Sequence, residues 1–518
     1  MAFRVTYATL SADNDELHAA FDRGIEVART MLGQRHASMI AGAEVDHGNG
    51  FTTVSPADRH VEVATFAAAK PSDVDTAVAS ARAARRAWAD RSWQERSDLC
   101  DRAADLISER RNELSALLTI EVGKNRLEAL GDVEETADLI RYYTHQLREH
   151  AGFEQPMGRL NPAENTSDVL RPYGVWAVIA PFNFPAALSG GPMGAALATG
   201  NTVVLKPSEV GGLTSLHMAK AFWDAGVPSD VLHVVFGTGE IVGDALVHHP
   251  HVDGITFTGS YDVGMEIYRT FAGAFPKPAI CEMGGKNPVI VSRHADLDVA
   301  AEGTMRSAFG LTGQKCSAAS RAYVERDVYD AFITALVARA ESVAIGDPLD
   351  RTTWMGPIID AAAVERYERA VHHARQVGRV LTGGRRITDG DLANGNYVAP
   401  TVAEIPEDSS LWDEELFAPF IAVMPVDSLA EAIERANDTS LGLTAGFFST
   451  EPSEVDEFLR GIEAGVVYVN RRAGATTGAW PGVQPFGGWK GSGSGGKAGG
   501  GPYYVQQYLR EQSRTVVE

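Results

Sequence analysis

Residues 172–205 read PYGVWAVIAPFNFPAALSGGPMGAALATGNTVVL, and this stretch decides which folds are open to the chain. It carries no charged residue, and its length alone would allow a membrane span, for which about 20 apolar residues suffice. Proline, glycine and asparagine interrupt it repeatedly, and these residues mark turns. The better interpretation is a strand, a turn, a buried helix and a second strand. The stretch therefore predicts the centre of a soluble α/β protein.

Short β-rich runs continue this pattern along the chain. They are GVWAVIA (174–180), TVVLKP (202–207), VLHVVFG (231–237) and GITFTG (254–259), with helical patterns such as GGLTSLHMAKAFWDAG between them. Strands that alternate with helices in this way predict βαβ units and a parallel sheet. A second alternating series follows residue 282 and runs to GVVYVN (465–470). Two α/β units in series are therefore expected, after a helical layer that begins near Pro71.

Length and charge narrow the class of protein. A chain of 518 residues is too long for one hydrophobic core, and 44% hydrophobic with 22% charged residues is typical of a soluble globular protein. The 68 Asp and Glu residues outnumber the 46 Lys and Arg residues, which gives a net charge of −22. An acidic surface argues against nucleic acid as a partner. We expect neither a nucleic-acid nor a membrane partner.

The three cysteines, Cys100, Cys281 and Cys316, show no paired spacing. This argues against a disulfide framework and a CxxC zinc site, and no HExxH motif or other His/Cys cluster occurs, so no metal is expected. Unpaired cysteines suggest a reducing compartment, and the N-terminal residues lack the apolar segment of a secretory signal. The expected location is the cytoplasm.

Several short motifs could hold a dinucleotide cofactor. The motif GTGEIVG (237–243) is one residue longer than the usual fingerprint, and FTGSYDVG (257–264) follows a strand and opens a helix, where Gly259 would let a pyrophosphate approach. Taken singly, these glycines could equally well only tighten turns. The motif LKPSE places Lys206 and Glu209 beyond the end of a strand, where such sheets bind ligands, although a solvated charge pair would need no function.

Cys316 lies in AFGLTGQKCSAASR (308–321), among small residues and directly after a lysine. A nearby cation would favour the thiolate, which is the nucleophilic form. Most free cysteines are instead buried small hydrophobes, which is the interpretation for Cys100 and Cys281. No histidine lies near Cys316 in the sequence, which argues weakly against a hydrolase. The thiol alone leaves reactive and inert roles equally open.

Two further side chains could supply the base and the hydrogen-bond donor that a reaction at this thiol needs. Glu282, in CEMGGKNPVIV (281–291), ends a strand before a Gly-Gly turn, and burial there would raise its pKa and let it activate water. Asn183, in PFNFP (181–185), ends another strand, and its amide could bind an oxyanion. Each could be a turn residue, but together with the glycine loops they suggest one redox reaction.

The motifs PFNFP, LKPSE, FTGS, EMGGKNP, GQKCSA, EELFAPF and PFGGWKGSG resemble, in order and spacing, those of NAD(P)-dependent aldehyde dehydrogenases. The resemblance implies an α/β fold with a Rossmann-type cofactor domain, an α/β catalytic domain and a small β oligomerisation extension. It implies the catalytic residues Cys316 as nucleophile, Glu282 as base and Asn183 as oxyanion donor. For the cofactor, NAD with NADP as a possibility, it implies Lys206, Glu209, Gly259, Ser260, Glu415 and Phe417. The family usually has glycine where this chain has Ala418.

Within that family the segments RSAFGLTGQKCSAASRAYV and KAGGGPYYV look like those of 1-pyrroline-5-carboxylate dehydrogenases. These enzymes oxidise L-glutamate γ-semialdehyde to L-glutamate in proline catabolism. The resemblance implies that the small-molecule aldehyde substrate contacts Glu135, Phe184, Ser317, Gly478, Ala479 and Phe486. Another semialdehyde, or an aliphatic or aromatic aldehyde, is the alternative substrate, and a non-redox thiol esterase is the alternative of a different class.

The resemblance also implies how the chain is divided. Residues 1–154 and 174–284 would form the cofactor-binding domain with an N-terminal helical extension, and residues 285–470 would form the catalytic domain. Residues 155–173 and 485–518 would be oligomerisation segments in a homodimer or an assembly of dimers, and residues 471–484 would form a substrate-anchor loop.

Overall fold

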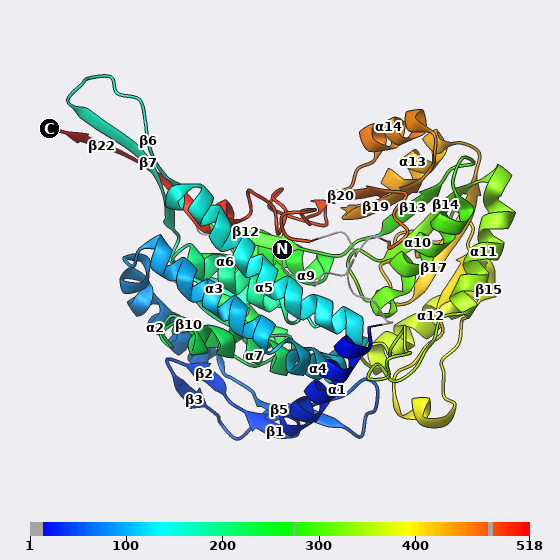
Figure 1. Cartoon of the computed structure of the whole chain (residues 1–518), viewed down its shortest axis with the longest axis horizontal. Coiled ribbons are helices and arrows are strands. Elements are labelled where there is room, and N and C mark those ends of the chain that lie inside the picture. Colours follow the sequence, from blue (N-terminus) through cyan, green and yellow to red (C-terminus); the bar gives the residue numbers. More distant parts are fainter. Residues whose placement is uncertain (1–13, 274, 475–479) are drawn as a thin grey trace.

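Two seven-stranded sheets organise the chain, as Figure 1 shows for this computed structural model, which describes residues 14–273, 275–474 and 480–518. The first sheet has the order β12-β11-β8-β9-β10-β2-β3 and the second has the order β15-β16-β17-β14-β13-β19-β20. The expectation of two α/β units is confirmed. The chain passes from one sheet to the other between Glu282 and Asn287, and the predicted domain boundary at 284/285 falls in this link but stays a prediction.

The first sheet is parallel over its five strands β12, β11, β8, β9 and β10, and β2 and β3 extend it in antiparallel fashion. The order strand, turn, helix, strand that residues 172–205 predict is confirmed by β8, α6 and β9. The bounds of the strands and of the helices after them are β2 (Ser38–Ile40), β3 (Ala43–Val45), β8 (Val175–Ile179), α6 (Ala187–Ala198), β9 (Thr202–Lys206), α7 (Gly212–Asp224), β10 (Leu232–Val234), α8 (Asp244–His248), β11 (Gly254–Thr258), α9 (Tyr261–Thr270) and β12 (Ala279–Glu282).

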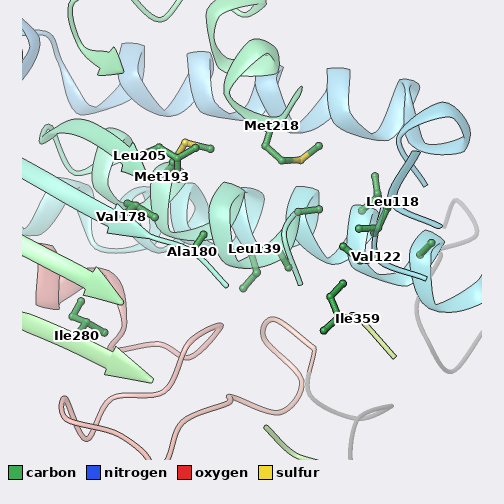
Figure 2. Packing of buried hydrophobic residues seen from close by; sticks show 14 of the residues in the cluster. Leu118, Val122, Leu139, Val178, Ala180, Met193, Leu205, Met218, Ile280 and Ile359 are labelled. Carbon is green, nitrogen blue, oxygen red and sulfur yellow. The ribbon is translucent and has the colours of Figure 1, made fainter. Parts of the chain in front are cut away.

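A layer of long helices covers the first sheet (Figure 1). The side chains on most of these helices and on alternate strand residues form one apolar core, whereas residues 74–81 pack in a second core with the strand residues between them. Figure 2 shows Leu118 and Val122 on the helical layer, and Val178 and Leu205 on the sheet, among the residues of the first core. The helices that precede β8 in the chain are α1 (Asp15–Thr30), α2 (Pro71–Ala89), α3 (Trp93–Glu109), α4 (Arg111–Val122) and α5 (Arg126–Glu149). The core thus fixes α4 and α5 against the strands that end at the site described below.

The second sheet is parallel except for its edge strand β15, which pairs with β16 in antiparallel fashion. Its helices surround it in the right half of Figure 1. The bounds are β13 (Asn287–Val291), α10 (Leu297–Phe309), β14 (Ala319–Glu325), α11 (Tyr329–Glu341), α12 (Ala361–Val377), β15 (Arg379–Thr382), β16 (Thr401–Glu404), β17 (Phe420–Val426), α13 (Leu429–Asn437), β19 (Thr444–Phe448), α14 (Pro452–Gly461) and β20 (Val466–Val469).

A narrow β extension projects from the body, with the C-terminal end near its tip (Figure 1). Its strands β6 (Glu154–Pro156), β7 (Glu164–Pro172) and β22 (Leu509–Val517) form an antiparallel sheet of order β22-β7-β6. The predicted oligomerisation segments 155–173 and 485–518 include these strands, and their role stays a prediction. The remaining small sheets contain β1 (Gln34–His36), β4 (Gly50–Val54) and β5 (Glu62–Ala67), and β18 (Leu441–Gly442) with β21 (Trp489–Lys490).

None of the helices in the described ranges is both long and apolar enough to cross a membrane. The uncharged stretch 172–205 is instead divided between buried strands and the short buried helix α6.

Candidate active site

Four parallel neighbours, β9, β8, β11 and β12, all end at one edge of the first sheet. Each is followed or ended by a residue that the sequence singles out: Lys206 ends β9, Asn183 follows β8, Gly259 follows β11 and Glu282 ends β12. Open α/β sheets bind ligands beyond the carboxyl ends of their strands. The topology therefore brings together residues that lie far apart in the sequence.

A cavity of about 110 Å³ lies at this edge. Cys316 and Glu282 line it together with predicted substrate residues on three other segments. Most of the lining is apolar or aromatic, which excludes water and strengthens electrostatic interactions inside. The predicted site residues that line the cavity are Glu135, Phe184, Glu282, Cys316, Ser317 and Phe486.

Cys316 is a free and partly buried thiol in this cavity. Burial raises its pKa to about 12, and the negative charges of Glu415 and Glu282 add to that shift. Backbone N–H groups of Ser317 and of Cys316 itself act in the opposite direction. The resting side chain is therefore a protonated thiol at neutral pH, and its attack on a carbonyl requires a group that takes the proton.

Glu282 is the carboxyl group best placed for proton transfer. Burial raises its pKa to about 8, against a smaller opposing effect of the Gly488 backbone N–H. Its Oε2 atom is buried and has no hydrogen-bond partner, which leaves one carboxyl oxygen available beside the cavity. A carboxyl group with a pKa near 8 is suited to gain and lose a proton in the physiological range.

Asn183 is buried on the loop of residues 181–186, called the Asn183 loop here. Its Nδ2 donates a hydrogen bond to the carbonyl oxygen of Gln314 at 3.0 Å. Gln314 belongs to the segment of residues 310–316, called the Cys316 loop here. An amide nitrogen carries two hydrogens, so one donor remains after this bond. The bond therefore fixes the Asn183 amide against the Cys316 loop, and its role as an oxyanion donor stays a prediction.

Lys315, which precedes Cys316 in the sequence, interacts more strongly with other charged groups than with the thiol. Burial lowers its pKa to about 8, and the carboxylate of Glu128 opposes that shift more strongly than the thiol does. For Cys316, the largest effects come from burial and from two carboxylates. The argument that the lysine favours a thiolate is therefore outweighed in this structure.

The predicted adenosine-side residues lie beside the cavity residues along the same sheet edge. Lys206 is buried, and its Nζ lies 3.7 Å from Oε1 of Glu209, which also accepts a hydrogen bond from the Gly239 N–H at 2.9 Å. Ser260 is exposed at the N-terminus of α9, where its side chain makes no capping bond. A free helix N-terminus favours a phosphate, and a carboxylate favours a ribose diol, so these residues fit a dinucleotide.

Glu415 and Phe417 connect this edge with the second unit. Oε1 of Glu415 accepts a hydrogen bond from the Gly285 N–H at 2.9 Å, close in sequence to Glu282. The left-handed backbone in this motif lies at Phe417, with φ of 51°, and not at Ala418, so an alanine can replace the usual glycine there. The Phe417 ring packs edge-on against Phe182 of the Asn183 loop. The roles of both residues toward a cofactor stay predictions.

The remaining predicted substrate residues divide into two groups. Glu135, Phe184, Ser317 and Phe486 face one cavity, whereas Gly478 and Ala479 lie outside the described residues. The glycine-rich tail adds Gly500, which has φ of 67° and donates its N–H to the Tyr143 hydroxyl at 3.1 Å. Gly499 and Gly500 therefore lie in a turn that lines the cavity.

Sequence reasoning missed the lining residues Tyr143, Trp480 and Tyr504, the last two of which lie in segments that it singled out for other reasons. Trp480 donates its Nε1–H to Asp138 at 2.8 Å, and Tyr143 stacks on Tyr504. The apolar face of the helix at 126–149 is the signal that could have identified Tyr143. No group of three or more His, Cys, Asp or Glu side chains able to hold a metal occurs in the part of the chain that the structure describes.

Comparisons with known proteins agree on one family. The model described as "Aldehyde dehydrogenase family" matches residues 44–514. Among curated proteins, "1-pyrroline-5-carboxylate dehydrogenase 1" of Halalkalibacterium halodurans is 37% identical over 505 residues, which is 96% of either chain. The 1-pyrroline-5-carboxylate dehydrogenase of Geobacillus thermodenitrificans is 37% identical over 510 residues, 97% of either chain.

A solved structure gives the same result. The 1-pyrroline-5-carboxylate dehydrogenase from Thermus, with bound NAD, superposes with a TM-score of 0.92 at 34% identity, covering 98% of this chain and 97% of that one. This similarity extends over both seven-stranded sheets and the β extension.

Proposed function

The chain belongs to the aldehyde dehydrogenase family, and from this premise we propose that it oxidises L-glutamate γ-semialdehyde to L-glutamate with NAD+ in proline catabolism. The observation that carries the chemistry is the cavity shared by the Cys316 thiol and the unpartnered Oε2 of Glu282. Overall, one aldehyde, one NAD+ and one water give one carboxylate, one NADH and two protons.

The reaction begins at Cys316, whose sulfur forms a bond to the aldehyde carbon. The thiol proton goes to Glu282, the carboxylate in the same cavity whose raised pKa suits it to accept one. Protonation of Glu282 also removes one of the negative charges that disfavour the thiolate. The aldehyde oxygen becomes an oxyanion, which accepts a hydrogen bond from the remaining donor of the Asn183 amide.

Bound NAD+ would supply the hydride acceptor, and loss of a hydride from the carbon attached to Cys316 would leave a thioester on this residue. Lys206, Glu209, Gly259 and Ser260 hold its adenosine and pyrophosphate half in this proposal, and Glu415 and Phe417 position the nicotinamide ribose. The carboxylate of Glu209 favours NAD+ because it repels the 2′-phosphate of NADP+.

Hydrolysis of the thioester completes the cycle. Glu282, once deprotonated, takes a proton from water, and the water oxygen attacks the thioester carbon. The carbon–sulfur bond breaks and Cys316 is released as it began. The base must be ionised for this step, so the rate of hydrolysis should rise with pH through the pKa of Glu282, which is about 8.

The proposed substrate fits the lining in chemical type. Phe184 and Phe486 would cover the aliphatic stem of the semialdehyde, Ser317 lies beside the nucleophile, and Glu135 would face the substrate's amino group. We assign the contact with the α-carboxylate to the backbone of Gly478 and Ala479, as the family resemblance implies.

A substrate panel tests the proposal directly. We expect the highest kcat/KM with glutamate γ-semialdehyde and NAD+, compared with succinate semialdehyde, hexanal and benzaldehyde, each with both cofactors. A higher kcat/KM for another aldehyde would overturn the substrate, and no cofactor reduction with any aldehyde would overturn the chemistry.

Assembly and location follow from two further features. β22 is an edge strand whose Val516 and Val517 are 59% and 69% exposed, and an unpaired strand edge with apolar side chains is a site for pairing with another chain. We infer a homodimer or an assembly of dimers built through the β extension. Light scattering should give at least a dimer mass, reduced when both valines are replaced by serine. The free cysteines support a cytoplasmic location.

A further inference from the structure

A group of charged side chains that the proposed reaction does not use lies at the junction of α4 and α5. Lys124 and Asp132 are fully buried, and Glu128 is partly buried between them along the chain. Glu128 and Asp132 lie four residues apart, so they occupy the same face of α5. Buried charges are costly unless they are paired and hydrogen-bonded, so their partners indicate what they do.

Asp132 and Lys124 hold the Asn183 loop at two points. Lys124 Nζ donates to Asp132 Oδ2 at 2.9 Å, and Asp132 Oδ1 accepts the N–H of Ala187, at the end of the loop, at 2.9 Å. Lys124 Nζ also lies 3.5 Å from the centre of the Phe184 ring, a cation–π contact. The loop is therefore held at Phe184 and at Ala187, where α6 begins.

Glu128 holds the Cys316 loop in the same way. Its Oε1 accepts the N–H of Leu311 at 2.6 Å. Leu311, Thr312 and Gly313 have φ values of 48°, 57° and 68°, so two residues with side chains adopt the left-handed region in succession. Such a conformation is strained and persists only where its surroundings hold it. Glu128 holds the first of these three residues.

The two loops are joined at Gln314 and Lys315. The Gln314 carbonyl oxygen accepts a hydrogen bond from the Asn183 amide. At Lys315, which precedes Cys316, the charge of Glu128 raises the pKa and the charge of Lys124 lowers it. A Cβ on Gly310 would lie 2.7 Å from Lys315 Nζ and 3.6 Å from Glu128 Oε1, so both groups gather at one point of the loop. The α5 face thus reaches both loops at once.

We propose that Lys124, Glu128 and Asp132 are positioning residues that hold the Asn183 loop and the Cys316 loop in register across the cavity. The inference rests on the proposed roles of Asn183 and Cys316. The three side chains act through the loops and touch neither the substrate nor the cofactor. A shift of one loop against the other would misplace the oxyanion donor relative to the sulfur, and a misplacement of about 1 Å can cost about 100-fold in rate.

The test separates the two loops by two readouts on the full-length enzyme. The first is kcat and KM with glutamate γ-semialdehyde and NAD+. The second is the rate at which iodoacetamide alkylates Cys316, followed by mass spectrometry, which reports on the Cys316 loop without substrate. We expect Glu128→Ala to lower kcat about 10- to 100-fold and to change the alkylation rate, with KM little altered. Glu128→Gln keeps the acceptor for Leu311 and should restore most of kcat.

Asp132→Ala should lower kcat to a similar extent but change the alkylation rate much less, because its hydrogen bond is to the other loop. The matched control is Glu134→Ala. Glu134 is nearly as buried on α5, but it accepts from Ser108 at 3.1 Å and faces α3 instead of the loops. This control should lower Tm and leave kcat and alkylation unchanged.

The proposal is overturned if Glu128→Ala and Asp132→Ala keep wild-type kcat, or if Glu134→Ala lowers kcat as much as they do. If the alanine variants do not fold, Gly310→Ala replaces them, since its methyl group would displace Lys315. Lowered kcat with altered alkylation then supports the proposal, and wild-type values overturn it. Failure of the proposed function is seen separately, as a wild-type enzyme that reduces no cofactor with any aldehyde.

Discussion

The residues on the cavity side and on the cofactor side of the same sheet edge differ in how strongly burial disfavours their charged forms. Around the cavity, burial raises the pKa of Cys316 to about 12 and of Glu282 to about 8, so both groups favour their uncharged forms. On the cofactor side, the Glu209 side chain is 39% exposed. Its carboxylate forms an ion pair with Lys206 and accepts a hydrogen bond from a backbone N–H. A change of charge should therefore have a larger effect at Cys316 or Glu282 than at Glu209. Substitutions should rank accordingly.

Cys316→Ala should have the largest effect. Loss of the nucleophile should lower aldehyde oxidation on the order of 10⁴-fold or more, while the Kd for NAD+ changes little because the cofactor side is intact. Stopped-flow NADH formation and calorimetric titration measure the two quantities. Cys281→Ala, which alters a buried cysteine on β12, is the matched control and should stay active. Full activity in Cys316→Ala would contradict the assignment.

Glu282→Gln comes next, with an expected fall in kcat of about 10²–10⁴-fold. In the wild type, kcat should rise with pH and level off above about 8, because the carboxyl group must be ionised to accept a proton from water. The glutamine variant should lack this rise. An unchanged pH profile in the variant would mean that another group is the base. The rise of kcat with pH would then not report on Glu282.

Asn183→Ala should lower kcat about 10²–10³-fold, since one donor to the oxyanion is lost. The substitution also removes the bond to Gln314, so the iodoacetamide rate at Cys316 separates a displaced loop from a lost donor. Asn183→Asp keeps the shape of the side chain but replaces the donor with an acceptor, and it should be at least as impaired. A normal kcat in Asn183→Asp would rule out the oxyanion role.

Glu209→Gln should have the smallest effect, because the group is partly exposed. Removal of its charge should improve kcat/KM with NADP+ relative to NAD+ by about 5- to 10-fold, the size of a screened interaction between two charges. The ratio of the two kcat/KM values measures it, and kcat with saturating NAD+ serves as the internal control. A shift of several hundredfold would show that this edge is as sensitive to charge as the cavity.

The sequence was sufficient for the parts of the molecule that depend on local patterns. The turn residues that interrupt the uncharged stretch 172–205 predicted β8, α6 and β9, and Glu282 was expected at the end of a strand, where β12 ends. These local predictions succeed because apolar runs and turn residues mark where strands and helices begin and end. The strand order, which the sequence analysis did not predict, is what brings the strand ends to one edge.

Other parts depend on contacts that no local pattern encodes. The bond between Glu128 and Leu311 joins residues 183 positions apart, and it places Lys315 beside a carboxylate instead of leaving it to act on Cys316 alone. The departure at Ala418 was interpretable only once the backbone angles were known, because the left-handed residue is Phe417. Tertiary packing decides such features, and a single sequence carries no direct trace of it.

Trp480, Phe486 and Tyr504 form one wall of the cavity, and all three follow Cys316 in the sequence. This order matters while the chain is being synthesised. During synthesis, the first sheet, Glu282 and Cys316 leave the ribosome before this wall exists, so the thiol is made long before its enclosure. The nascent chain therefore passes through a period in which Cys316 meets bulk water and cellular oxidants with one side of its cavity open. Oxidation damage at this cysteine should accordingly increase when translation slows between residues 320 and 480, and protection should begin only when the tail has docked.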